Sequence, residues 1–161
     1  MGVLPGESFH SMLVYRITLP KFANDLSGEG SRIFGSRWNH KGICCLYAAE
    51  SRALALLEFS VNTRIHDLPG LLSIITYNIP ESIHQLRVTD LPANWDNPIV
   101  TDKTRDFGTN LLNESNAVAI QIPSVVIPQE FNFLINPRHP EMKKVTIADI
   151  SPFSFDVRLK K

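Results

Sequence analysis

The sequence predicts an α+β domain with a mainly antiparallel or mixed sheet. Short apolar runs of strand length recur along the chain, and only two stretches between them have helical character. These runs follow no regular strand–helix–strand rhythm, and no internal repeat is present. A chain of 161 residues with 43% hydrophobic content is long enough for one domain with its own core.

Strands are expected where β-branched and aromatic residues cluster: 12–17, 43–48, 71–79, 117–122, 131–135 and, from its alternating pattern, 154–159. Pro80 and Pro123 end the third and fourth of these runs. Ser51 is a candidate N-cap for a helix that follows, and a weaker helix is predicted over 104–113. The glycine- and serine-rich segment 21–39 is predicted to be a loop.

The N-terminal residues 1–11 are small and polar, and they have no periodicity. We therefore expect a flexible extension over 1–11 and a single domain over 12–161. Cys44 and Cys45 lie in the apolar run Gly-Ile-Cys-Cys-Leu-Tyr. Adjacent cysteines seldom bridge each other, so these two are predicted to be small core residues in a reducing compartment.

Charge and hydropathy exclude several classes of protein. Sixteen basic residues balance sixteen acidic ones, which disfavours direct nucleic-acid binding. The apolar runs are far shorter than the roughly 20 residues of a membrane span, and no signal peptide is visible, so a cytoplasmic protein is expected. No metal site is expected, because the five histidines lack zinc-type spacing: His10, His40, His66, His84 and His139.

The predicted helix after Ser51 contains an isolated acid. Between Ala53 and Val61 the only ionisable side chain is that of Glu58, and helical spacing places it on the same face as Leu54 and Leu57. An unpaired carboxylate in apolar surroundings is costly unless it is neutralised or hydrogen-bonded. Glu58 is therefore a candidate for a chemical role, with a core salt bridge as the alternative.

The first predicted strand also contains an isolated charged residue, an arginine. Arg16 lies within an apolar run and needs an anionic partner, either an internal carboxylate or a bound phosphate. The glycine-flanked segment with Arg37, Trp38 and Asn39 combines a cation, a flat aromatic ring and a carboxamide. That combination suits a ligand with phosphates and a ring, although a surface loop anchored by Trp38 would have the same composition.

Three further residues have an ordinary structural interpretation, and for two of them a functional one is open as well. Tyr47, at the end of a predicted strand, could stack on a ring or belong to the core. Ser124 follows Pro123 and alone would be an ordinary turn residue. His139 could act as a base, but the two prolines around it favour a turn. The sequence contains no nucleophile elbow, no P-loop and no glycine-rich dinucleotide fingerprint.

The order of these segments resembles that of the RES-domain proteins, the toxin halves of bacterial RES–Xre toxin–antitoxin systems, which are named for an arginine, a glutamate and a serine. The likeness extends from residue 13 to residue 159. Its segments are Val14-Tyr15-Arg16, Gly35-Ser36-Arg37-Trp38-Asn39, Leu46-Tyr47-Ala48, the helix with Glu58, Ile122-Pro123-Ser124, residues 132–140 and residues 153–159.

The resemblance implies a fold similar to that of ADP-ribosyltransferase toxins and the consumption of NAD+. It implies that Arg16 holds the NAD+ phosphates with help from Arg37, and that Tyr47 contacts the nicotinamide side. Glu58 would be the catalytic carboxylate, and Ser124 would line the pocket. The implied partner is an Xre-type antitoxin that blocks the cleft, and toxins of this kind are commonly dimeric within such complexes.

The chemistry of NAD+ cleavage is consistent with these assignments. Breaking the nicotinamide–ribose bond develops positive charge on the ribose, which a carboxylate at low local dielectric stabilises. Nicotinamide leaves readily, so no metal is expected. Transfer to water or phosphate would give an NAD+ hydrolase or phosphorylase, whereas transfer to a target protein would give an ADP-ribosyltransferase. A non-catalytic domain with Glu58 and Arg16 paired in its core is a further alternative, and neutral charge disfavours an RNA-cleaving toxin.

Overall fold

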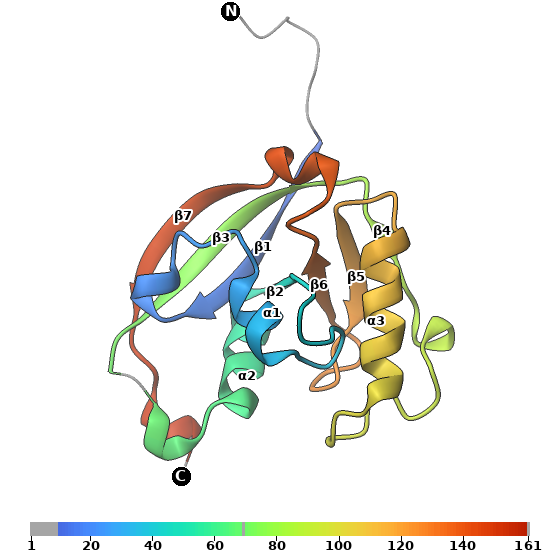
Figure 1. The fold of residues 1–161 in the computed structure, drawn as a ribbon. Coiled ribbons are helices and arrows are strands. Elements are labelled where there is room, and N and C mark those ends of the chain that lie inside the picture. The colour runs from blue at the N-terminus through green and yellow to red at the C-terminus, as the bar shows by residue number, and fades with distance from the viewer. Residues whose placement is uncertain (1–9, 69, 161) are drawn as a thin grey trace, which may run out of the picture.

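A seven-stranded mixed sheet forms the centre of the computed structural model, which describes residues 10–68 and 70–160 (Figure 1). The strand order is β4-β5-β6-β2-β1-β3-β7, and every neighbouring pair is antiparallel except β4 and β5. The predicted α+β class is confirmed. The strands are β1 (Ser11–Thr18), β2 (Leu46–Ala49), β3 (Leu72–Pro80), β4 (His84–Gln85), β5 (Ala119–Pro123), β6 (Phe131–Ile135) and β7 (Thr146–Phe153).

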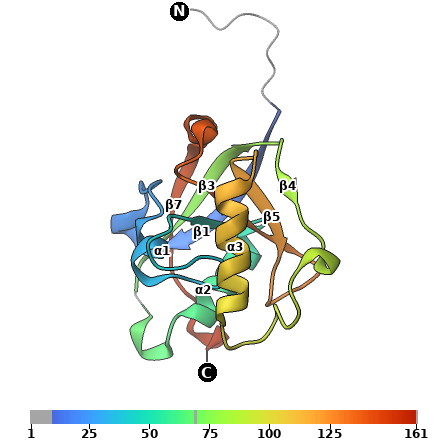
Figure 2. The same cartoon turned by 45° about the vertical axis from the view of Figure 1, so that its right-hand side comes forward.

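Three α-helices accompany the sheet over the described ranges: α1 (Glu29–Phe34), α2 (Arg52–Asn62) and α3 (Asp102–Glu114). Helix α2 contacts β1 and β2, whereas α3 packs Leu112 against Ile120 of β5. Figures 1 and 2 show α3 on the β4–β5 side of the molecule, with α1 and α2 near the other half of the sheet. Short 3₁₀ turns occupy Pro20–Phe22, Ile65–Asp67, Val88–Asp90, Pro140–Lys144 and Val157–Leu159.

The start of α2 confirms the predicted cap. The Ser51 side-chain oxygen accepts a hydrogen bond from the backbone N–H of Leu54 at 3.0 Å, which satisfies one of the free donors of the first turn. Leu54 and Ala55 are buried in a cluster that includes Leu72 of β3. The buried face does not reach the end of the helix, because Val61 is 62% exposed.

Two predicted segments differ in extent. Residues 21–39 are not all loop, because Gly28 adopts the left-handed conformation (φ 66°) and begins the short helix α1. A helix of six residues is too short to produce a visible period in the sequence. The second strand begins at Leu46 rather than at residue 43, since the Ile43 N–H donates to the carbonyl of His40 in a turn.

The predicted final strand at 154–159 is wrong. The side chain of Asp156 accepts a hydrogen bond from the Arg158 N–H at 3.0 Å and caps a 3₁₀ turn there. The last strand is β7, an edge strand that pairs with β3 through an irregular register between Thr76 and Tyr77. Edge strands tolerate Pro152 and many exposed side chains, which explains why the sequence pattern is weak.

Other expectations concern single residues. Cys44 and Cys45 are buried and unpaired, as predicted. His139 has the predicted turn role: its Nδ1 accepts from the Glu141 N–H at 3.0 Å. Of the extension predicted over 1–11, residues 1–9 lie outside the described residues, and Ser11 already belongs to β1. None of the helices in the described part of the chain has the length and apolar character needed to span a membrane.

Candidate active site

A cleft of about 720 Å³ opens between α2, the α1 region and the sheet. Its charged lining residues are Arg16 of β1, Glu58 of α2 and Arg37, which follows α1. Tyr15, Trp38, Tyr47 and Phe59 supply aromatic side chains, and small, aliphatic and uncharged polar side chains complete the lining. The cleft therefore combines two guanidinium groups, one carboxylate and several flat rings.

Glu58 has a defined orientation in this cleft. Its Oε1 accepts hydrogen bonds from Ser124 Oγ and from Asn132 Nδ2, both at 2.7 Å. No hydrogen bond or ion pair engages Oε2 within residues 10–68 and 70–160. Charge-assisted hydrogen bonds of this kind contribute roughly 1.5–3 kcal/mol each. One carboxylate oxygen is thus fixed by the protein, while the other remains available to a ligand.

Ser124 lies behind Glu58 and has no exposed surface. Its Oγ accepts hydrogen bonds from the backbone N–H groups of Val126 at 3.1 Å and Ile127 at 3.2 Å. Because these donors occupy the hydroxyl lone pairs, the hydroxyl proton is directed at Glu58. Ser124 is not among the residues that line the cleft, so the structure places it in contact with the carboxylate rather than with the open space.

Asn132 is a site residue that the sequence reasoning missed. It lies on β6, opposite Ala49 of β2 and Ile122 of β5, and it lines the cleft. A polar side chain within the run Phe-Asn-Phe-Leu-Ile was the available signal, the same signal that singled out Arg16. Its Oδ1 is buried without a hydrogen-bond partner among the described residues, so the amide donor is aimed at Glu58 while the acceptor is left unsatisfied.

Arg16 is half-buried and points from β1 toward the cleft. It forms no ion pair with Glu58 or any other acid in the described part of the chain, so the internal salt bridge considered for it is not found there. The guanidinium also acts on a neighbour: burial raises the pKa of the Tyr77 phenol, and the positive charge of Arg16 partly offsets that rise. Arg16 therefore presents an uncompensated positive charge to the cleft.

Arg37 is anchored more firmly. Its Nη1 donates to the carbonyl oxygens of Trp95 at 2.9 Å and Asn97 at 2.7 Å. Partial burial lowers the pKa of the guanidinium, and the negative charges of Glu58 and Asp96 oppose that shift. An arginine remains a cation under such perturbation, so both cleft arginines can bind an anion.

Trp38 and Tyr47 line the cleft beside Arg37. Trp38 is 3% exposed and stacks on Trp95 with ring centroids 6.5 Å apart. The Tyr47 hydroxyl accepts from the Trp38 N–H at 3.3 Å and donates to Asn39 Oδ1 at 2.6 Å. Burial raises the pKa of the Tyr47 phenol well above its usual value, so it stays neutral and can keep both hydrogen bonds.

Asn39 is fully buried and is not among the lining residues. Its amide nitrogen donates to the carbonyl groups of Ser31 at 2.8 Å, His40 at 3.1 Å and Ile43 at 3.1 Å. With its oxygen bound to Tyr47, every polar atom of this side chain is used within the protein. The structure thus brings five of the predicted site residues to one cleft and places Asn39 and Ser124 behind its walls.

No group of three or more His, Cys, Asp and Glu side chains that could hold a metal ion occurs in the described ranges. The charged groups of the cleft are the two arginines and Glu58, and its uncharged polar lining residues include Asn132, Asn62, Ser31 and Ser36. Such a set can bind a phosphate-containing ligand and place one carboxylate oxygen against a centre that becomes positively charged.

Comparison with known proteins identifies the family of this chain. The toxin Res of Yersinia enterocolitica is 34% identical over 92% of this chain and 100% of its own length. The Prs ADP-ribosylating toxin of a Sphingobium species is 33% identical over 85% of this chain and 88% of its own. The crystal structure of the M. tuberculosis MbcT–MbcA toxin–antitoxin complex contains a chain with the same fold, at 14% identity and a TM-score of 0.64, over 90% of this chain and 85% of that one. The RES domain matches residues 13–156, and the chain therefore belongs to the RES-domain family.

Proposed function

We propose that this protein is the toxin of a toxin–antitoxin system and that it consumes NAD+ by breaking the bond between nicotinamide and ribose. The first support is the family, since relatives named toxin Res match this chain over almost their full length. The second support is the cleft, whose charges suit a dinucleotide with a pyrophosphate.

The observation that carries the proposal is the orientation of Glu58. Two donors hold Oε1, so Oε2 is left to face a bound ribose. As the C–N bond breaks, nicotinamide leaves with the bonding electrons and the ribose gains oxocarbenium character. A fixed carboxylate at low dielectric stabilises that charge as it develops, and preorganised electrostatics of this kind commonly contribute more to catalysis than any other single effect.

Substrate positioning follows from the other lining residues. Arg16 and Arg37 can hydrogen-bond the pyrophosphate oxygens, and the partly exposed ring of Tyr47 offers surface for a base ring. Holding the dinucleotide in this way places its scissile bond near Glu58. Correct positioning alone can remove several kcal/mol from a barrier.

The acceptor decides the enzyme class. Water would add to the ribose carbon and lose a proton, giving free ADP-ribose, whereas phosphate would give its 1-phosphate ester. Glu58 is the only acid among the described residues that line the cleft. We favour these small acceptors, because no second carboxylate in the described ranges lines the cleft to activate a side chain of a target protein. Transfer to a side chain of a target protein is the second candidate, and it is supported by the relative named Prs ADP-ribosylating toxin.

We further propose that an Xre-type antitoxin covers the cleft. The similar fold in a toxin–antitoxin complex supports a protein partner. Three apolar side chains are exposed here: the lining residue Val61 at 62%, and Phe34 at 77% and Ile99 at 76%, which adjoin lining residues in the sequence. Exposed apolar groups at the mouth of a cleft are typical of protein-binding surfaces.

The test is incubation of the purified protein with NAD+ labelled in its adenylate half, in buffer with and without phosphate. Release of nicotinamide with the label in small molecules is the expected result, and label on added cell protein would favour the transferase. A folded protein that leaves NAD+ intact under all these conditions, and that still arrests growth when expressed, would contradict the proposal.

A further inference from the structure

Residues 36–40, here called the Trp38 loop, contribute Ser36, Arg37 and Trp38 to the cleft wall and rest on the outer helix α3. We propose that α3 sets the position of this loop, and that Gly108, Asp106 and Thr109 are positioning residues for substrate binding. No residue of α3 lines the cleft, so their effect must pass through the loop. The inference depends on the proposed function for its kinetic test only.

The first support is a contact between backbones. A Cβ atom added at Gly108 would lie only 2.6 Å from the carbonyl carbon and from the Cβ of Trp38, closer still to its carbonyl oxygen, and such approaches below 3.0 Å do not occur in proteins. Glycine is otherwise a poor residue for a helix interior. The structural reason for it here is that α3 lies directly against the Trp38 backbone.

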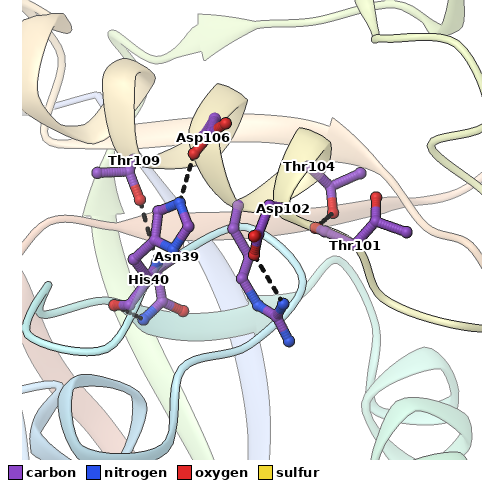
Figure 3. Close-up of polar contacts among 8 residues, drawn as sticks. Asn39, His40, Thr101, Asp102, Thr104, Asp106 and Thr109 are labelled. Carbon is purple, nitrogen blue, oxygen red and sulfur yellow. Dashed lines mark hydrogen bonds and ion pairs between the residues drawn. The ribbon is translucent and has the colours of Figure 1, made fainter.

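Two hydrogen bonds attach His40 of the loop to α3, at positions on either side of Gly108. His40 Nε2 lies 2.5 Å from Asp106 Oδ1, and the His40 N–H donates to Thr109 Oγ1 at 3.1 Å (Figure 3). Asp106 and Thr109 are three residues apart and therefore share one face of α3. Together with Gly108 they hold the loop against sliding along the helix.

Contacts of the loop connect its position on α3 to the residues that line the cleft. Phe107 of α3 packs on the Trp38 ring, with centroids 6.0 Å apart, and Trp38 stacks in turn on Trp95. The adjacent Arg37 is bound to the carbonyl of Trp95. A shift of the Trp38 backbone would therefore displace both an aromatic wall and a phosphate-binding cation.

Helix α3 is closed within its first turn, and near its C-terminus it is hydrogen-bonded to another part of the chain. Its N-terminal turn is closed by the Thr104 hydroxyl, which donates to the Thr101 carbonyl at 3.1 Å, and by the Arg105–Asp102 pair (Figure 3). Near its C-terminus the Asn136 amide donates to the Leu112 carbonyl at 2.9 Å. The helix can therefore act as a fixed support for the loop.

The first experiment compares Gly108→Ala with Asn110→Ala, an exposed position on the same helix. Both changes add helix propensity, but only the first collides with Trp38. We expect Gly108→Ala to raise the KM for NAD+ about tenfold with little change in kcat, since a displacement near 1 Å can cost on the order of 100-fold in efficiency. Asn110→Ala should match the parent.

Tryptophan emission tests the placement without any substrate. The chain has two tryptophans, Trp38 and its stacking partner Trp95, with 3% and 7% of their surfaces exposed. Gly108→Ala should shift their emission and increase quenching by acrylamide, whereas Asn110→Ala should not. This measurement holds even if the protein proves inactive on NAD+, so failure of the proposed function and failure of this inference remain distinguishable.

The second experiment covers the case in which Gly108→Ala does not fold. Asp106→Ala removes the acceptor for His40, and Asp106→Asn keeps an acceptor oxygen in the same place. We expect Asp106→Ala to raise KM about two- to fivefold, the size of a modest hydrogen-bond contribution, and Asp106→Asn to restore most of that loss. Parental KM and parental emission in a folded Asp106→Ala protein would overturn the inference, as would an equal loss in both Asp106 variants.

Discussion

At the scale of single residues, the site depends on a carboxylate whose two oxygens have different environments. Glu58 Oε1 is held by Ser124 and Asn132, and Ser124 is held in turn by two backbone donors. Several buried polar groups therefore fix the orientation of one side chain. Such an arrangement is typical of a catalytic group and its supporting contacts.

Replacement of Glu58 by glutamine tests this role directly. Glu58→Gln keeps the size of the side chain but removes the negative charge, so we expect kcat for nicotinamide release to fall at least about 100-fold, as when other electrostatic contributions to a transition state are deleted. Nicotinamide release by chromatography and growth arrest after induction measure the effect. Glu114→Gln, an exposed change at the end of α3, is the matched control. Equal toxicity of Glu58→Gln and the parent at equal expression would exclude the catalytic assignment.

Asn132 gives a second prediction for the same carboxylate. Asn132→Asp exchanges the amide donor for a second negative charge beside Glu58, and like charges at this distance disfavour each other's ionisation. We therefore expect the acidic limb of the pH–rate profile to move to higher pH. Asn132→Ala, which removes the donor without adding charge, should lower kcat with a smaller displacement of that limb. Identical profiles for Asn132→Asp and Asn132→Ala would argue against an ionised Glu58 in the reaction.

The sequence could identify Arg16 and Glu58 because a charged residue in an apolar run is visible without a structure. The same rule would have found Asn132. It could not place Asn39 and Ser124 behind the cleft, since the direction of a side chain in a loop depends on contacts with distant parts of the chain. Ser124 meets Glu58 across 66 positions and Asn132 meets it across 74.

At the scale of elements, α2 carries Glu58 to the cleft, and its capped start contributes to its stability. Ser51→Ala removes the bond to the Leu54 N–H and should reduce the free energy of unfolding by about 1 kcal/mol. A chemical denaturation curve measures this loss. Ser51→Asp keeps an acceptor and adds favourable charge at the helix start, so it should retain parental stability. A smaller loss in Ser51→Ala than in Ser51→Asp would show that the cap does not act in this way.

Elements with strong local signals were predictable, and those defined by distant partners were not. The central strands and α2 combine a clear hydrophobic pattern with a cap or a terminating proline. Strand β7 has neither, because it is an edge strand that relies on β3 for its pairing. Helix α1 is defined by Gly28 and Gly35 rather than by periodicity.

At the scale of the whole molecule, the order of the strands assembles the site. Strand β2 lies between β1 and β6, so it places Tyr47 between the strands that carry Arg16 and Asn132. Helix α2 follows β2 directly and covers β1, which brings Glu58 to the same cleft. Sequence periodicity predicts the strands individually, but it contains no information about this order.

The whole molecule should also lose stability in alkali. Burial raises the pKa values of Tyr47, Tyr77 and Cys45 above their ordinary values of 10.0, 10.0 and 9.0. These groups ionise at those ordinary values once the chain unfolds, so the unfolded state is increasingly stabilised as the pH rises past them, while the folded state resists ionisation. The free energy of unfolding should therefore be unaffected by these groups below about pH 9 and should fall progressively above it.

The variant Tyr77→Phe identifies the source of this loss. The Tyr77 hydroxyl is buried and has no hydrogen-bond partner within the described residues, so its removal should leave the unfolding midpoint at neutral pH unchanged or higher. Without a phenol to ionise in the unfolded chain, the midpoint should fall less steeply between roughly pH 9 and pH 11. Thermal unfolding across this range, with Tyr47 left intact as an internal reference, measures the difference. An unchanged slope in Tyr77→Phe would assign the alkaline transition to Tyr47 and Cys45 instead.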